Sequence, residues 1–161
     1  MCFQKGIARL LRQGDVQGAV RELGKAVPSH PERSLSHQNL LAICKAEMEN
    51  LEESKALFHR ILVQKPGDPR VLNNLGNVAL LQGKPQEALK LYRRAAVLNP
   101  WAVEPRYNSC LAYLEMGHIE KALLAFQEYA LLSKVLIWGK ALFWGVLPVL
   151  IAVSICVRYL R

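Results

Sequence analysis

A pattern of small, apolar and turn-forming residues recurs along this chain with a period of 34 residues, and it restricts the fold more than any other feature. The pattern is clearest over residues 69–102, where such residues return at helical spacing on both sides of a glycine turn. The residues that carry it are Leu72, Leu75, Gly76, Ala79, Gly83, Ala88, Tyr92, Ala95 and Pro100. A repeat of this kind predicts a stack of helical hairpins, each burying its apolar face against the next.

The same unit can be read on both sides of this central one. In register before it are Leu41, Ala42, Phe58, Ile61 and Pro66, and after it Cys110, Tyr113, Gly117, Ala122 and Phe126. A first unit, one residue out of phase, has Gly14, Ala19, Leu23, Ala26 and Pro31. In the second unit Ser54 replaces the usual small alanine and Glu49 replaces the turn glycine. We predict helices at residues 2–13, 16–28, 35–48, 51–64, 69–82, 85–98, 103–116 and 119–133.

The pattern closely resembles the tetratricopeptide repeat (TPR), whose unit is a helix–turn–helix of 34 residues. The resemblance covers about residues 1–134 and implies an all-α, TPR-like superhelix of about four hairpins. It further implies that Gly76 and Ala88 lie where the two helices of a hairpin approach closely. Larger residues such as Leu75 and Tyr92 are then expected to fill the space between hairpins.

The C-terminal stretch, residues 135–161, has a different composition. Residues 141–157 hold no charge, and these 17 residues would span roughly 25 Å of a hydrocarbon core near 30 Å. The span is sufficient if Lys140 extends its charge toward the interface. Aromatic residues that resemble interfacial anchors are Trp138, Trp144 and Tyr159. We therefore predict a repeat domain at 1–134 and one transmembrane helix with a short basic tail at 135–161. The alternative is a buried helix that caps the last repeat.

The formal charge of +8 supports a membrane segment more than a nucleic-acid site. Four of the 21 basic residues lie from position 134 onward with no acid, so half of the excess flanks the predicted span: Lys134, Lys140, Arg158 and Arg161. No stripe of alternating basic and aromatic residues is present, which argues against RNA or DNA as a partner. The four basic residues divide two and two, so they do not set the orientation.

The predicted topology resembles that of a tail-anchored protein. No apolar signal sequence is visible at the N-terminus, which favours a repeat domain on the cytosolic side of a single-pass membrane protein. A bacterial inner membrane and an organelle outer membrane are not distinguished. Small residues recur in the predicted span at steps of four, three, four and four: Ala141, Gly145, Pro148, Ala152 and Cys156. Such a stripe lets membrane helices pack closely, although a chance stripe is an equal alternative.

No stretch of the sequence predicts catalysis, a cofactor or a metal site. The histidines lie on different hairpins without a metal-binding or catalytic motif around them: His30, His37, His59 and His118. The four cysteines share no ligand spacing and are typical of a reducing compartment. We therefore expect a protein that is not an enzyme.

The concave surface of the predicted superhelix carries the candidate binding residues. We expect it to present Asn39, Arg70, Asn73, Asn74, Asn77, Tyr107, Asn108 and Leu111. Asn74 and Asn108 lie one period apart and should form neighbouring rungs, and an asparagine amide both donates to and accepts from a peptide backbone. Peptide-binding TPR proteins use asparagines at matching places, as the resemblance implies. The alternative is solvated asparagines on an open face.

We interpret the chain as a membrane-anchored TPR scaffold whose partners are proteins and the lipid bilayer. In one version it is an accessory or assembly subunit whose helix packs on integral membrane subunits. In the other it is a tail-anchored adaptor, of the organelle-fission type, whose groove recruits a peptide of a soluble client. The complete clamp for a C-terminal carboxylate also needs basic residues on a following unit, where this chain has the predicted span, so binding of chaperone tails is not expected.

Overall fold

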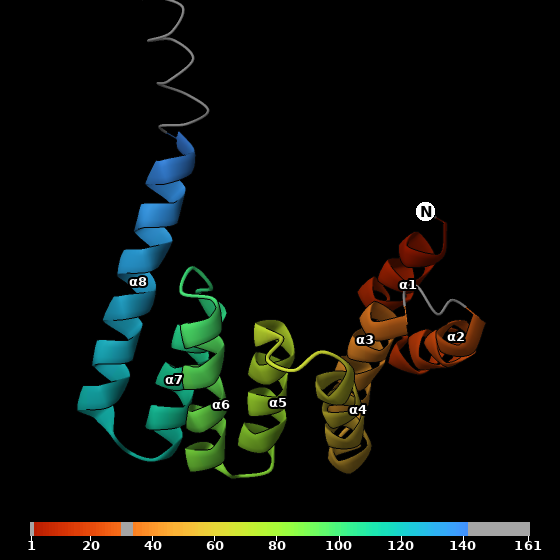
Figure 1. Cartoon of the computed structure of the whole chain (residues 1–161), viewed down its shortest axis with the longest axis horizontal. Coiled ribbons are helices and arrows are strands. Elements are labelled where there is room, and N and C mark those ends of the chain that lie inside the picture. Colours follow the sequence, from red (N-terminus) through yellow and green to blue (C-terminus); the bar gives the residue numbers. More distant parts are fainter. Residues whose placement is uncertain (1, 30–33, 142–161) are drawn as a thin grey trace, which may run out of the picture.

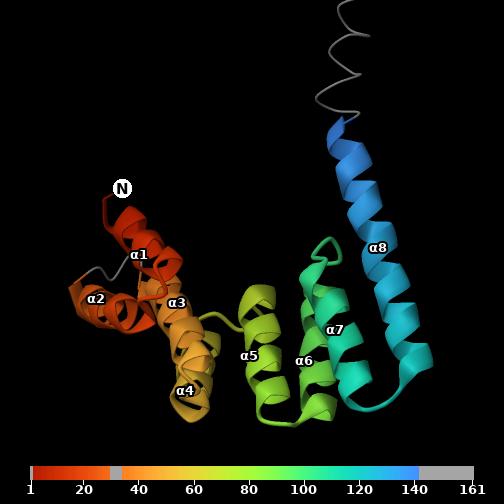
Figure 2. The same cartoon turned by 180° about the vertical axis from the view of Figure 1, so that it is seen from behind.

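The computed structural model describes residues 2–29 and 34–141, and over these ranges the protein is entirely helical (Figure 1). The helices are α1 (Cys2–Arg12), α2 (Val16–Ser29), α3 (Ser34–Glu47), α4 (Leu51–Gln64), α5 (Pro69–Leu81), α6 (Pro85–Leu98), α7 (Glu104–Glu115) and α8 (Ile119–Ala141). Consecutive helices pair as hairpins that stand side by side in chain order, as Figures 1 and 2 show from opposite sides. The predicted TPR-like stack of about four hairpins is confirmed.

Helix boundaries agree with the predicted ones to within a residue except at the last helix. We predicted an end at residue 133, and this was wrong, because α8 continues to Ala141. It therefore runs without a break across the predicted domain boundary between residues 134 and 135. Residues 134–141 hold no proline, and the one glycine among them, Gly139, does not stop the helix. As a result α8 reaches beyond the other helices of the stack (Figure 2).

The turns inside the four hairpins share one geometry. In the third hairpin the Gly83 N–H donates to the Leu80 carbonyl and the Lys84 N–H donates to the Ala79 carbonyl, both at 2.9 Å. Equivalent pairs of bonds close the other turns, at Gly14, Glu49 and Gly117. All four turn residues have φ between 61° and 76°, the left-handed conformation that ends a helix in this motif. Glycine adopts it freely, so Glu49 is the strained member of the set.

Replacing Glu49 by glycine is expected to raise the free energy of unfolding by about 1 kcal/mol, because the left-handed conformation costs a residue with a Cβ about 1–2 kcal/mol. Urea unfolding followed by circular dichroism measures the change. The control is Ala56→Gly, at an exposed position inside α4, which should lower stability by about 1 kcal/mol. Equal destabilisation by both glycines would show that the turn at Glu49 is not strained.

The core of the stack is built from small residues facing large ones. Between the third hairpin and α7, the fully buried Tyr92 lies with Ala79, Ala88, Leu89 and Ala112. The ring of Tyr92 also covers Gly76, where no side chain would fit. These contacts agree with the predicted close approach at Gly76 and Ala88 and with the predicted position of Tyr92.

Ser54 can replace the small alanine of the second unit because its buried hydroxyl makes a hydrogen bond. The side chain is completely buried, and its Oγ donates to the backbone carbonyl of Ala42 at 2.7 Å. The bond joins α4 to α3, so it satisfies a polar group that burial would otherwise penalise.

Candidate protein-docking groove

A hollow of about 510 Å³ lies on the face formed by the first helices of the hairpins. Its walls come from α3, α5, the start of α7, the loop between α6 and α7, and one residue of α8. The residues that carry its polar and aromatic character are Asn39, Arg70, Asn73, Asn74, Trp101 and Glu104. The hollow therefore brings together four of the eight residues that the sequence predicted for the concave surface.

The asparagines of this surface are bonded to one another across neighbouring helices. Asn108 on α7 donates from Nδ2 to Oδ1 of Asn73 at 3.0 Å and to Oδ1 of Asn77 at 2.9 Å, both on α5. Asn74 donates to Oδ1 of Asn39 on α3 at 3.4 Å, a longer and weaker bond. The amide groups thus form a ladder that ties three successive hairpins together.

The ladder is diagonal, unlike the predicted arrangement of Asn74 beside Asn108. Each amide reaches the asparagine 35 residues earlier, one position off the repeat period. Asn77 also accepts a bond from the Tyr92 hydroxyl at 2.9 Å, which links the ladder to the buried core. Asn73, Asn77 and Asn108 therefore link the hairpins, whereas Asn39 and Asn74 share only the longer bond and are the predicted amides most available to a ligand.

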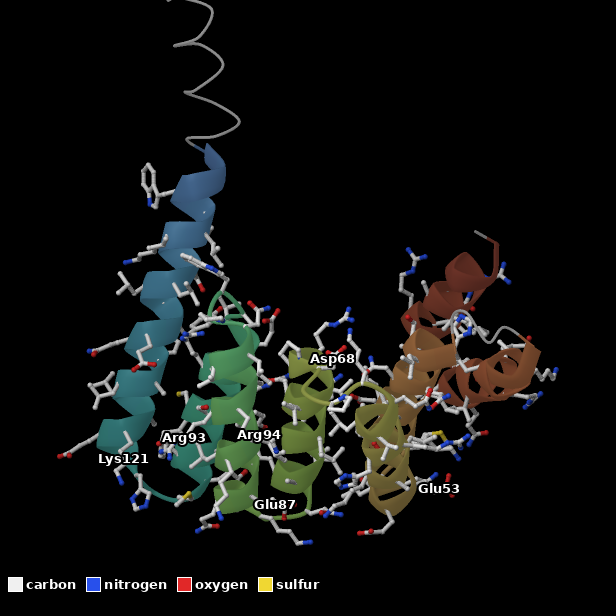
Figure 3. All side chains as sticks on the ribbon, in the orientation of Figure 1. Glu53, Asp68, Glu87, Arg93, Arg94 and Lys121 are labelled. Carbon is white, nitrogen blue, oxygen red and sulfur yellow. The ribbon has the colours of Figure 1, made fainter. Side chains whose placement is uncertain are left out.

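Asp68 fixes the start of α5 and the position of Arg70. Asp68, which Figure 3 labels, is buried. Its carboxylate accepts from the Arg70 backbone N–H at 3.0 Å and lies 2.9 Å from the Lys65 ammonium. Burial alone would raise the pKa of Asp68, but the bonds from Lys65 and the Arg70 N–H outweigh it and the pKa is lowered. The carboxylate thus stays ionised. Its Oδ1 lies 3.6 Å from Nε of Arg70, whose side chain is 82% exposed and lines the hollow.

The two other predicted concave residues lie at the C-terminal end of the stack. The ring of Tyr107 is 5.4 Å from that of Tyr129 on α8, and Tyr129 is 5.8 Å from Phe126. Leu111, one turn further along α7, is exposed. This end of the concave surface is therefore aromatic and apolar, in contrast to the amide-rich hollow.

Among the lining residues that sequence reasoning missed are two large apolar ones, Trp101 and Leu136. Trp101 follows the proline that ends the third unit, and its exposed side chain borders the hollow together with Leu136 of α8. An exposed tryptophan directly after Pro100 was a usable signal, whereas Leu136 enters only because α8 is longer than predicted. Of the predicted membrane-helix stripe, Ala141 is the last described residue, and Gly145, Pro148, Ala152 and Cys156 lie outside the described part.

Within residues 2–29 and 34–141 no group of histidines, cysteines and carboxylates could hold a metal ion. Cys44 and Cys110 are buried and unpaired, and burial, with a smaller contribution from Glu47, raises the pKa of the Cys44 thiol. A protonated, buried thiol is a poor nucleophile. The groove remains the candidate site of the described chain.

The family model for the tetratricopeptide repeat matches residues 69–101, which are the third hairpin of the stack. Residues 69–101 are therefore a tetratricopeptide repeat. Comparison with curated protein sequences returns no match.

Solved structures of MamA share the TPR fold of the chain. MamA from Desulfovibrio magneticus RS-1 superposes with a TM-score of 0.66 at 21% identity, over 81% of this chain and 73% of that one. MamA AMB-1 superposes with a TM-score of 0.65 at 19% identity, over 80% of this chain and 75% of that one. MamA MSR-1 superposes with a TM-score of 0.63 at 21% identity, over 80% of this chain and 73% of that one. Arrays of such repeats present extended concave surfaces to other proteins, so the fold is that of a protein-interaction scaffold.

One described helix is long and apolar enough to cross a membrane, the part of α8 from Ile119 to Gly139. Length and composition alone are weak evidence, and 11% of its most apolar window is buried inside the protein. This stretch begins earlier than the predicted span, of which residues 142–157 lie outside the described part.

Proposed function

We propose that the protein is a membrane-tethered TPR scaffold that docks other proteins at a membrane complex, as an accessory or assembly subunit. The observation that carries this proposal is the amide-rich hollow on the concave side, bordered by the exposed Arg70 and Trp101. An extended peptide offers alternating N–H and carbonyl groups, and the hollow presents both donors and acceptors. The oxygen of Asn74 takes no part in its ladder bond, so it can accept from a peptide N–H.

Charge defines the kind of peptide that suits the groove. Arg70 can bind one acidic group, and Glu104, which also lines the hollow, favours a neighbouring positive or neutral group. Described residues beyond α7 add no basic side chain to the lining of this hollow. An internal peptide segment with groups of both charges therefore fits the hollow better than a C-terminal carboxylate, which needs several cations.

The tether is proposed from α8 and the sequence that follows it. α8 leaves the stack as a continuous helix, and the next residues, 142–157, carry no charge. A helix continued from α8 into a bilayer would hold the groove close to the membrane surface. Integral subunits are then the nearest partners, which favours an accessory subunit over an adaptor for a soluble client.

Purification of the full chain in mild detergent, with mass spectrometry of the chains that co-purify, tests this function. Integral membrane proteins in stoichiometric amount are the expected result. A single soluble client in their place would support the adaptor of the organelle-fission type. Recovery of the chain alone, from both membrane and soluble fractions, would contradict a scaffold.

The groove itself is tested by the double variant Arg70→Ala with Asn74→Ala. Each lost contact is worth on the order of 1 kcal/mol, so affinity for a partner identified by co-purification should fall at least about tenfold. Stability should change little, because Arg70 is exposed and the Asn74 bond is long. Isothermal titration measures the affinity, and Arg94→Ala on the exposed side of α6 (Figure 3) is the control. Equal affinity of both variants would show that the hollow is not the docking site.

A further inference from the structure

An uncovered apolar seam runs along α8. Its members are spaced by alternating steps of four and three residues, namely Ile119, Leu123, Phe126, Ala130, Ser133 and Ile137. This 4–3 spacing is the pattern by which two long helices pair side by side. Ile119, Leu123, Phe126 and Ile137 are exposed, although each is a large apolar side chain.

The preceding hairpin shows that the same surface is normally covered. Leu123 and Phe126 occupy the positions of Leu89 and Tyr92, one period earlier. Leu89 is 7% exposed and Tyr92 is fully buried, because α7 lies against them, whereas Leu123 is 57% and Phe126 45% exposed. Within the described chain no later helix takes the place of α7. The seam is thus a helix-accepting surface that no helix among the described residues covers.

The length of the seam restricts the occupant. From Ile119 to Ile137 it covers 18 residue steps, about 27 Å of helix. A helix like α7, of 12 residues, covers about 18 Å and would leave the upper part bare. Among the described helices, which otherwise have 11 to 14 residues, α8 with 23 residues is the one long enough.

The remaining 20 residues of the chain are a poor cover for the seam. A capping helix needs a polar outer face, and residues 142–157 contain no charged side chain to provide one. The same composition is the basis for proposing a membrane tether. Covering the seam with this segment would remove that tether.

We propose that the seam binds a second copy of this chain, with the two α8 helices parallel and in register. The parallel direction rests on the proposed membrane tether, because two copies held by their C-terminal segments in one membrane point the same way. Beside the seam stand Gln127 and Lys134 on one flank and Ala122 and Tyr129 on the other. In a parallel pair Lys134 of one copy faces Tyr129 of the other, so no like charges are opposed.

Cysteine cross-linking of the full chain in phospholipid vesicles tests the pairing. In a parallel, in-register pair each seam residue faces its own counterpart, so Ser133→Cys and Ile137→Cys should form disulfide-linked dimers on mild oxidation. The background carries Cys2→Ser and Cys156→Ser, and the buried Cys44 and Cys110 are retained. The matched control is Leu131→Cys, on another side of α8, because Leu131 is 67% exposed and Ile137 is 66% exposed.

We expect at least tenfold more dimer from Ser133→Cys and Ile137→Cys than from Leu131→Cys. Adding Leu123→Glu and Phe126→Glu to the first two variants should abolish their dimer. Equal cross-linking at 131 and 137, or monomer at all three, overturns the proposal. Cross-linking only to a chain of different mass also overturns the proposed pairing and would show that the seam binds another protein. Flotation of the same vesicles reports on the tether, so the dimer and the proposed function can fail separately.

Discussion

Replacing Gly76 by valine is expected to lower the free energy of unfolding by about 3 kcal/mol. A Cβ at position 76 would lie 2.8 Å from Cδ1 and 3.1 Å from Cζ of Tyr92, and closer still to Cε1. Overpacking of a filled core typically costs 1–3 kcal/mol, and the β-branched valine is at the upper end of that range. Small domains have a free energy of unfolding of only about 5–15 kcal/mol, so this loss is a large fraction of the total stability.

The ring of Tyr92 cannot move aside to relieve this contact. It is completely buried between α5, α6 and α7, and its hydroxyl donates to Asn77 at 2.9 Å. Burial also raises the pKa of Tyr92, so the phenol stays protonated and keeps this bond. A shift of the ring would break the link between the core and the asparagine ladder.

Urea unfolding of Gly76→Val and of three further variants measures the effect. Gly24→Ala is the control, because a Cβ at this exposed helical position meets no atom within 4 Å and alanine should stabilise α2 by up to about 1 kcal/mol. Tyr92→Ala alone should cost about 3–5 kcal/mol, and in combination with Gly76→Val the total should be smaller than the sum. Strict additivity would show that Gly76 and Tyr92 are not in conflict.

The helical stack could be predicted from sequence because its determinants are local and periodic. Positions such as Gly76, Ala88 and Tyr92 repeat every 34 residues, and the turn residues Gly14, Gly83 and Gly117 mark the hairpins. Glu49 departs from this pattern, yet its turn closes with the same pair of backbone hydrogen bonds as the glycine turns. Periodicity therefore overrides a single unfavourable residue.

The details of the groove depended on geometry that spacing does not determine. Asparagines one period apart lie on adjacent helices, but the stagger between α5 and α7 directs Asn108 to Asn73 and Asn77. Such a shift of one position follows from how the helices cross. It changes the role of these amides from exposed ligand groups to links between hairpins.

The end of α8 could not be predicted because two signals compete there. Packing on α7 favours an end near residue 133, as in the earlier units, whereas residues 134–141 contain no proline or other strong stop signal. The helix therefore continues, since nothing in residues 134–141 requires a turn. The extension creates both the upper wall of the hollow at Leu136 and the upper half of the seam.

Removing the residues after Ser133 is expected to convert the protein from a membrane-bound to a soluble form. The full chain should remain with membranes during carbonate extraction, because 17 uncharged residues, 141–157, are transferred into the hydrocarbon core. A chain ending at Ser133 keeps the contact of α8 with α7, where Ala122 and Ala125 pack on Cys110, so it should stay folded. Sedimentation after extraction measures the distribution of each form.

A third form, ending at Ala141, decides which part of the C-terminal region enters the membrane. It retains all of α8, including the apolar stretch from Ile119 to Gly139. We expect it in the soluble fraction, because the first half of α8 packs on α7 and carries Glu120, Lys121 and Glu128, whose charges are costly in hydrocarbon. If this form stayed with the membrane, α8 itself would be the span and would have to leave the last hairpin. If the full chain were extracted as readily as the chain ending at Ser133, residues 142–161 would be a cap and not an anchor.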